Sequence, residues 1–466
     1  MTPDEIRSLF SLKMSQMYRE EVPAYGDLCD LVEDINIKVL NADNKLYEQL
    51  KSTDNLDRIS EERHGAIRLG KAEELTMITR LFSVMGMEPV SYYDLSANGV
   101  PVHSTAFRPI TKESLSTSPF RVFTSLLRIE LIKNDTLREQ AKKILETREI
   151  FSDKLKSLIY LAEKKGGLDT KNSEQLIEEA VNVFRWHKEA SVDSSLYTAL
   201  KNSHALTADV VSFKGPHINH LTPRCLDIDQ LQKRMPEKGI NPKAVIEGPP
   251  SSVPVLLRQT SFKALTEAVL FNGQAGEHTA RFGEVEQRGI ALTPAGRRLY
   301  DEILNRVLVR CKPAANGSNR EEYNQVLIEE FKDFPSDFIV MVSKGLAYCE
   351  YVLTDKVKGV SSKNLSDNID TLINDGVVKM SAIIYEDFLP ASAAGIFQSN
   401  LGDDAKEEGL KPPSQDEFEM ALGCPVYSEF DLYQKQQDLS LTIALSQIRH
   451  LKSGHELDSW SIESLT

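Results

Sequence analysis

Apolar residues recur at the helical period along the first fifty residues of the chain. Spacings of three and four positions separate Leu28, Leu31, Val32 and Ile35. Residues at these spacings share one face of a helix. The pattern therefore predicts amphipathic helices from about Pro3 to Leu50.

After about residue 60 the pattern changes to short extended segments around one helix. We predict a strand over Ala66–Leu69, a helix over Ala72–Val84, and strands over Glu88–Leu95 and Pro101–Arg108. Gly86 is well placed to end the helix, because glycine adopts the left-handed conformation that terminates many helices.

A similar order returns in the middle of the chain. We predict a strand, a helix and three more strands over His217–Leu221, Asp227–Met235, Lys243–Glu247, Val255–Phe262 and Thr279–Gln287. This is a β-α-β-β-β order, of which the earlier block is a partial version. The pair His64-x-x-x-Arg68 is echoed by His220-x-x-x-Arg224, which suggests a duplicated unit, although coincidence also explains two such short matches.

The remaining segments are mostly helical in pattern, over Leu126–Lys201 and from Ala295 to about Asp375. Tyr385–Leu401 is apolar and punctuated by serine and glycine. We therefore expect one catalytic unit, 1–440, and a polar C-terminal tail, 441–466. Within this unit we expect N-terminal helices over 1–60, a first β-α-β module over 61–125 and a helical insertion over 126–205. A second β-α-β-β-β module over 206–295 and a helical region with the apolar segment over 296–440 complete the unit.

Composition narrows the class of protein. The chain has 466 residues, 41% hydrophobic and 27% charged, with a formal net charge of −14. These proportions are typical of a folded soluble protein. The acidity argues against nucleic acid as a partner, because phosphate binding needs a basic face. The five cysteines form no CxxC pair, the N-terminus lacks a signal peptide, and no apolar run could span a membrane. We expect a cytoplasmic protein with reduced thiols.

The candidate metal ligands are His64, His220 and Glu284. Two imidazoles and one carboxylate hold Fe(II) in non-heme iron oxygenases and leave the opposite face of the ion open. Spacing alone leaves alternatives: a surface His64–Arg68 pair, or a structural histidine at position 220. His217 would face away from His220 on a strand, whereas Glu284 and Glu286 would share a face, one as ligand and the other as its orienting partner.

The segment Phe282-x-Glu284-Val285-x-Gln287-Arg288 resembles the carboxylate-ligand strand of hydroxyphenylpyruvate dioxygenase. That enzyme belongs to the vicinal oxygen chelate superfamily, which is built from β-α-β-β-β modules. Most of the chain, to about Tyr433, resembles the bacterial 2-oxoadipate dioxygenase/decarboxylase family. The shared stretches are Glu62–Arg68, Tyr92–Leu95, Val102–Pro109, His217–Arg224 and Ser392–Asn400.

The resemblance implies an α+β fold in which vicinal-oxygen-chelate-like modules form a curved mixed sheet around a metal site, with extensive helical additions. It implies Fe(II) on His64, His220 and Glu284, although a purified sample could carry zinc, nickel or manganese. Arg68 matches the arginine that binds the substrate carboxylate. Ala391 and Ser392 match a backbone contact to substrate, and close relatives carry valine at position 391.

The implied reaction converts 2-oxoadipate and O2 to 2-hydroxyglutarate and CO2, a step of lysine breakdown. The partners would then be a small 2-oxo dicarboxylate and O2, with no membrane and no nucleic acid. One alternative is an oxygen-independent metal-dependent isomerase or lyase of the same superfamily. A binding protein with structural zinc is less favoured, because such sites usually fill four protein positions, often with cysteine. The sequence does not indicate the oligomeric state.

Overall fold

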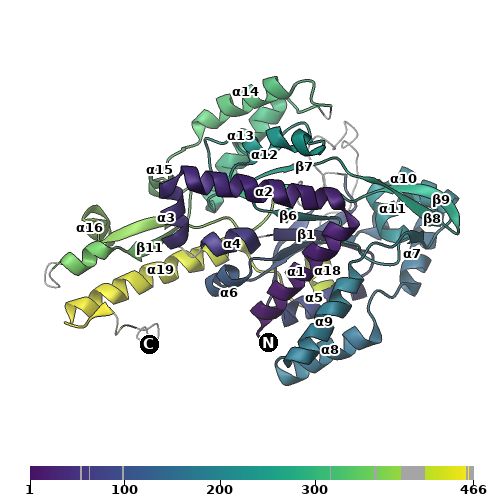
Figure 1. The fold of residues 1–466 in the computed structure, drawn as a ribbon, viewed down its shortest axis with the longest axis horizontal. Helices are drawn as coiled ribbons and strands as arrows, with labels where there is room; N and C mark the ends of the chain where they lie inside the picture. The colour runs from purple at the N-terminus through teal and green to yellow at the C-terminus, as the bar shows by residue number, and fades with distance from the viewer. Residues whose placement is uncertain are drawn as a thin grey trace.

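In this computed structural model, helices surround four small β-sheets in a mixed α+β arrangement (Figure 1). The structure describes residues 1–52, 55–61, 63–96, 99–314, 316–360, 365–389, 415–457 and 460. Within these ranges, no helix combines the length and apolar character needed to cross a membrane.

The elements in chain order have the following bounds. The helices are α1 Pro3–Glu21, α2 Pro23–Ala42, α3 Asn44–Ser52, α4 Asn55–Glu61, α5 Ala72–Val84, α6 Lys112–Thr117, α7 Asp135–Thr147, α8 Asp153–Lys165, α9 Thr170–Val183, α10 Ser194–Ser203, α11 Ala205–Ser212, α12 Ile228–Arg234, α13 Pro294–Arg310, α14 Arg320–Glu330, α15 Phe338–Ser343, α16 Ile369–Asn374, α18 Gln415–Leu422 and α19 Glu429–Lys452. The strands are β1 Arg63–Leu69, β2 Glu88–Asp94, β3 Val102–Arg108, β4 Arg121–Leu127, β5 Glu189–Ala190, β6 His220–Pro223, β7 Leu257–Ser261, β8 Thr266–Phe271, β9 Gln274–Thr279, β10 Glu284–Arg288, β11 Cys349–Leu353 and β12 Val378–Ala382.

The largest sheet has the strand order β2-β3-β4-β1-β6. Its first four strands and α5 form a complete β-α-β-β-β module, in which β1 lies parallel to β4. The predicted helix Ala72–Val84 is confirmed, and Gly86 follows it with φ 66°. The prediction missed β4, because all seven of its residues are buried and a continuous run shows no alternation.

The second module is less regular than its sequence suggested. β10 pairs antiparallel with β7 and bridges in parallel to Arg224, just after β6, so β6-β10-β7 repeats the order β1-β4-β3. The predicted strand Lys243–Glu247 is wrong. Within it only Glu247 forms a β-bridge, an isolated one with Gln259, and prolines follow at 249 and 250. The predicted strand Thr279–Gln287 begins only at Glu284, because Thr279 ends β9 and residues 280–283 are in no strand.

The two modules join through their first strands. β1 and β6 pair antiparallel, with Ala66 opposite His220 and His64 opposite Thr222. Gly65 makes the close approach possible, because a Cβ there would lie 2.6 Å from Ile218 Cδ1. The N-terminal helices secure the same junction: the Tyr18 hydroxyl on α1 donates to the carbonyls of Asn219 and Phe282.

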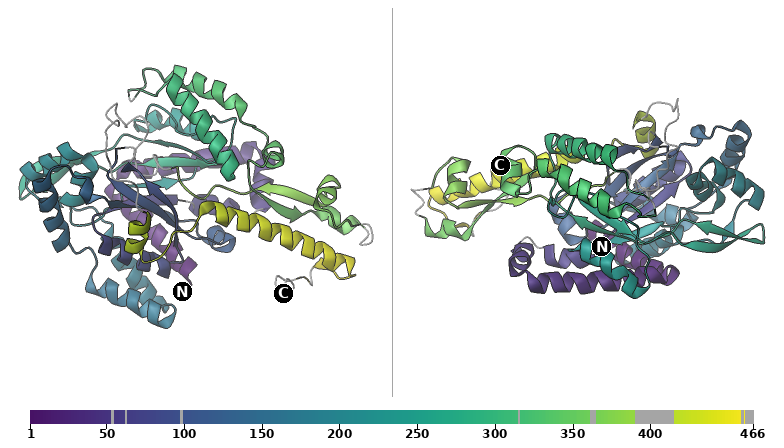
Figure 2. Two further views of the ribbon diagram at one scale, coloured as in Figure 1. Left: turned by 180° about the vertical axis from the view of Figure 1, so that it is seen from behind. Right: turned by 90° about the horizontal axis from the view of Figure 1, so that it is seen from above.

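An arm of the structure projects to one side, formed by β11, β12, α16 and α19 (Figures 1 and 2). α19 runs from Glu429 to Lys452, so the predicted tail boundary at residue 441 falls inside a helix and is wrong. Ala444 and Ile448 on this helix are buried at helical spacing, and Ile448 packs in a small apolar cluster with Leu372 and Val378. The tail prediction gave too much weight to the polar residues between these positions.

Candidate active site

The structure brings His64, His220 and Glu284 together at the junction of the two modules. They come from the start of β1, β6 and β10, and each is 0% exposed. One ligand atom from each lies within 4.8 Å of the others. Glu284 Oε1 is 3.2 Å from His64 Nε2 and 3.9 Å from His220 Nε2. Three such donors at this distance are suited to a single metal ion.

Glu286 lies on the opposite side of the His64 ring from Glu284. Its Oε2 is 3.0 Å from His64 Nδ1, and both of its oxygens accept hydrogen bonds from Arg288. Burial opposes the charge of Glu286, but Arg288 and His64 outweigh it and lower the pKa of the carboxyl to about 2. A charged carboxylate at Nδ1 favours the proton on that nitrogen and leaves Nε2 for a ligand.

The other two members of the cluster have polar atoms without hydrogen-bond partners in the described part of the chain. Glu284 Oε1 accepts hydrogen bonds from Thr222 and Gln259, whereas its Oε2 accepts none. Neither ring nitrogen of His220 has a partner. Burial lowers the pKa of His220 well below its usual value, so the ring is neutral, the form in which it binds metals. These buried and unsatisfied atoms fit a divalent cation.

His64 has the opposite electrostatic environment. Burial alone would lower its pKa, but the carboxylates of Glu286 and Glu284 raise it above the usual value. The two acids thus stabilise a positive charge at this position. A bound cation would satisfy the same acids in place of the proton.

Aromatic rings cover the cluster. Phe388 packs edge-on against His64 with ring centroids 4.8 Å apart, and Phe282 lies 4.7 Å from His220. Such apolar cover keeps water away from a site and strengthens its electrostatic interactions.

Buried arginines hold the segment that carries Phe388. Arg288 donates to the carbonyls of Tyr385 and Asp387, and Arg108 makes a bidentate ion pair with the Asp387 carboxylate. Glu386 pairs in turn with the buried Arg58 and Arg121. Sequence analysis missed these ion pairs, because among the four arginines only Arg108 lies in a predicted strand, Pro101–Arg108. Ala391 and Ser392, which follow this segment, lie outside the described residues.

Arg68 lies at the far end of β1 from His64. Its Nη1 is 2.6 Å from Asp209 Oδ2 on α11, and its side chain is 13% exposed. Asp209 belongs to a second buried group with His217 and His278, whose ligand atoms also lie within 4.8 Å of one another. His217 and His220 therefore face different clusters, as the sequence predicted, although the strand begins only at His220.

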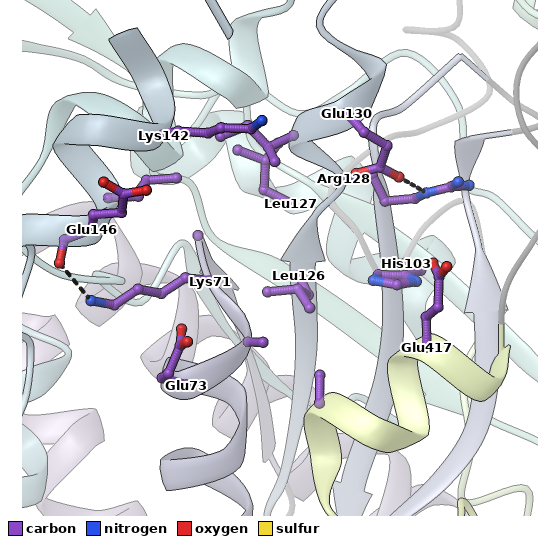
Figure 3. A pocket seen from close by; sticks show the side chains of 15 residues that line it. Lys71, Glu73, His103, Leu126, Leu127, Arg128, Glu130, Lys142, Glu146 and Glu417 are labelled. Atoms are coloured by element: carbon purple, nitrogen blue, oxygen red, sulfur yellow. Dashed lines mark hydrogen bonds and ion pairs between the residues drawn. The ribbon is translucent and has the colours of Figure 1, made fainter. Parts of the chain in front are cut away.

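A pocket of about 600 Å³ opens beyond the end of β1 (Figure 3). Lys71, His103, Arg128 and Glu417 are among its lining residues, and none of His64, His220 and Glu284 is. Burial and Arg128 lower the pKa of His103 to about 4. His103 thus lies apart from the cluster.

The fold and this cluster define a mixed α+β protein with a buried two-histidine, one-carboxylate centre. The family model described as 2-oxoadipate dioxygenase/decarboxylase matches residues 10–400, and the chain belongs to this family.

Individual relatives agree over nearly the whole length. The chain is 53% identical to the 2-oxoadipate dioxygenase/decarboxylase of Pseudomonas putida over 95% of this chain and 96% of that protein. It is 52% identical to the Escherichia coli protein of the same description, covering 94% and 98%. The crystal structure of Pseudomonas putida hydroxyglutarate synthase in complex with 2-oxoadipate superposes with a TM-score of 0.88 at 51% identity, covering 96% of this chain and 99% of that one.

Proposed function

We propose that this protein is an Fe(II)-dependent dioxygenase that converts 2-oxoadipate and O2 to 2-hydroxyglutarate and CO2. The observation that carries the proposal is the buried His64–His220–Glu284 cluster in a chain over half identical to relatives described by this activity. The 2-oxoadipate held by the Pseudomonas putida structure supports the choice of substrate. A cytoplasmic role in lysine breakdown is part of the proposal, and the five unpaired cysteines agree with a reducing compartment.

We propose His64, His220 and Glu284 as the metal ligands. Three protein ligands leave about three of six octahedral positions open. A bound Fe(II) would supply the redox chemistry with O2 and a Lewis-acid anchor for the keto and carboxylate oxygens of the substrate. Thr222 and Gln259 orient Glu284 by donating to Oε1, and Glu286 fixes the ring of His64.

The remaining roles concern the substrate. Arg68 shares a face of β1 with His64, four positions or ~13 Å further along the strand, so its guanidinium could grip the distal carboxylate of a molecule anchored at the metal. We propose that role for Arg68, and a backbone contact to substrate for Ala391 and Ser392. Phe388 and Phe282 exclude water from the reacting end.

The strand orders β1-β4-β3-β2 and β6-β10-β7 support the proposal that both modules are of the vicinal oxygen chelate type. In each module the first strand carries a histidine of the cluster. The antiparallel pairing of β1 with β6 places these histidines next to each other.

The test is anaerobic reconstitution with Fe(II), followed by O2 uptake with 2-oxoadipate and 2-oxoglutarate side by side. We expect faster uptake with 2-oxoadipate, release of CO2, and one atom of 18O2 in each of the new hydroxyl and carboxylate groups. Turnover that continues undiminished without oxygen would instead support a metal-dependent isomerase or lyase.

The same assay tests Arg68. Arg68→Lys should lower kcat/KM for 2-oxoadipate severely, since loss of a bidentate partner to a buried anion costs about 2–5 kcal/mol. Metal content should stay at the wild-type level, because Arg68 is not among the proposed ligands. A variant with wild-type kcat/KM would remove Arg68 from the substrate site.

A further inference from the structure

A buried carboxylate stands behind Arg68. Asp209 is 5% exposed, and Arg68, His217, His278 and Asn219 direct nitrogen atoms at it. Its Oδ2 accepts from Arg68 Nη1 at 2.6 Å, and its Oδ1 lies 2.9 Å from His278 Nε2 and 3.2 Å from His217 Nε2. The carboxylate is therefore held from two sides and is not a loose partner of the arginine.

The neighbours of Asp209 fix its charge and its position. Burial raises the pKa of the carboxyl, but His217, His278 and Arg68 outweigh burial and place it well below the usual value. The Tyr197 hydroxyl lies 2.8 Å from His278 Nδ1 and can donate to it, which leaves the His278 Nε2 proton for Asp209. Tyr197, His278, His217 and Asp209 are buried, and Arg68 is 13% exposed, so solvent has little access to these contacts.

Two helices that precede β6 and one strand of the β8–β9 hairpin supply this support. Tyr197 lies on α10, Asp209 on α11 and His278 on β9. The group also reaches the metal-type cluster: the Asn219 side-chain amide is 3.4 Å from Asp209 Oδ2, and Asn219 precedes His220 in the chain. The position of Arg68 relative to His220 is therefore set through side-chain contacts as well as through β1.

The same residues have the donor types of a second metal site, but the electrostatics favour a different role. Arg68 already brings a full positive charge to 2.6 Å from the carboxylate. A divalent cation at Asp209 would be repelled by this guanidinium, and the geometry to His278 is that of a hydrogen bond.

We propose that Asp209 is a positioning residue, which orients Arg68 to receive the distal carboxylate of the substrate. The inference rests on the proposed function, in which Arg68 grips that carboxylate. A guanidinium presents its donors in a rigid fork. Fixing Nη1 on Asp209 therefore fixes the direction of the other donors. Helices α10 and α11 thereby become part of substrate recognition.

The experiment compares Asp209→Asn with wild type on two substrates of equal length, 2-oxoadipate and 2-oxohexanoate, which lacks the distal carboxylate. Loss of a hydrogen bond to a charged group corresponds to a roughly tenfold to hundredfold effect. We expect kcat/KM for 2-oxoadipate to fall by that factor, mainly through KM, while kcat/KM for 2-oxohexanoate stays within about twofold. Asp4→Asn is the matched control, because it removes the carboxylate 2.7 Å from the fully buried Arg7 on α1.

A milder variant guards against misfolding of Asp209→Asn. Tyr197→Phe removes only the hydroxyl that faces His278, and it should lower kcat/KM for 2-oxoadipate by a smaller factor in the same direction. Equal losses on both substrates, or no loss on either, would overturn the positioning role. Loss of one metal equivalent from Asp209→Asn would also overturn it, in favour of a second metal site.

Calorimetric titration with 2-oxoadipate separates this inference from the proposed function. If the wild-type protein binds 2-oxoadipate without turning it over, the proposed reaction is wrong. Weaker binding by Asp209→Asn in that titration would still support the positioning role. Absence of binding by the wild-type protein would overturn both.

Discussion

His64 lies between two carboxylates that have different tasks. Glu284 faces Nε2 and lies 3.9 Å from His220 Nε2, while Glu286 faces Nδ1 and accepts hydrogen bonds from Arg288. The two acids are two positions apart on β10, so they point to the same side of the strand. The side chains that each acid contacts, and not its position on the strand, therefore distinguish the proposed ligand Glu284 from Glu286, which orients His64.

This distinction predicts different outcomes for two isosteric changes. Glu284→Gln should nearly abolish metal binding, because it removes a charged ligand. Glu286→Gln should weaken binding by about 10–100-fold, the usual effect of losing an orienting partner. Affinities for Fe(II) or Mn(II) from anaerobic calorimetry provide the measurement.

Glu350→Gln is the control for these two variants, since Glu350 is a largely buried carboxylate on β11 paired with Lys112. It should bind metal like the wild type. A stronger effect from Glu286→Gln than from Glu284→Gln would exchange the two roles.

The sequence predicted His64, His220 and Glu284 as ligands, because ligand type and family resemblance converge on them, and the structure brings the three together. It could not identify Asp209 as the partner of Arg68, which is 141 positions away, or the clamp between Arg108 and Asp387, 279 positions apart. No local pattern encodes such pairs. They depend on how the modules and the insertion pack.

Among the elements, a periodic difference between two faces was sufficient for prediction but not required, because β3 is buried throughout and still lies within the predicted strand Pro101–Arg108. α5 alternates buried and exposed residues at the helical period and was predicted at its observed bounds. β4 is buried throughout and was missed, and the bridge at Glu247 has too few ladder hydrogen bonds to count as a strand. The periodicity of apolar residues reveals an element when its two faces differ in exposure, so it gives no signal when both faces are buried.

α19 permits a direct test of its packing. Ile448→Ala should destabilise the arm by about 2–5 kcal/mol, because it leaves a cavity in the small cluster around Leu372. Leu439→Ala on the same helix, where Leu439 is 46% exposed, should change stability by less than ~0.5 kcal/mol. Urea unfolding and limited proteolysis would measure both. Equal effects would contradict the packing of α19 against the arm.

At the scale of the whole molecule, buried polar contacts join the hydrophobic clusters formed by the described residues. Glu429 is one such contact: it begins α19, accepts a hydrogen bond from Ser91 on β2 and lies 3.9 Å from Arg297 on α13. Burial, reinforced by Asp387, raises the pKa of Glu429 to about 8. The folded protein therefore retains a proton that the unfolded chain releases near pH 4.5.

The difference between the folded-state and unfolded-state pKa of Glu429 determines how stability changes with pH. A raised folded-state pKa stabilises the protein at low pH, and this contribution is lost as pH rises from about 4.5 to about 8. Glu429→Gln removes the contribution, so the variant should lose less stability than wild type between pH 6 and pH 9. Urea unfolding of the metal-free proteins at both values measures the difference. Parallel losses in the two proteins would contradict the assignment.

The pairing of β1 with β6 has a consequence for how the centre comes into existence. A fragment that ends before α11 contains His64 and Arg68 but neither His220 nor Glu284, and the complementary fragment contains the reverse. Neither half can complete the proposed metal site alone, so binding of a divalent cation measures the association of the two halves. Saturation at 100 times the dissociation constant would stabilise the docked state by ~2.7 kcal/mol. Two separately expressed halves should accordingly associate more tightly as the concentration of divalent cation rises.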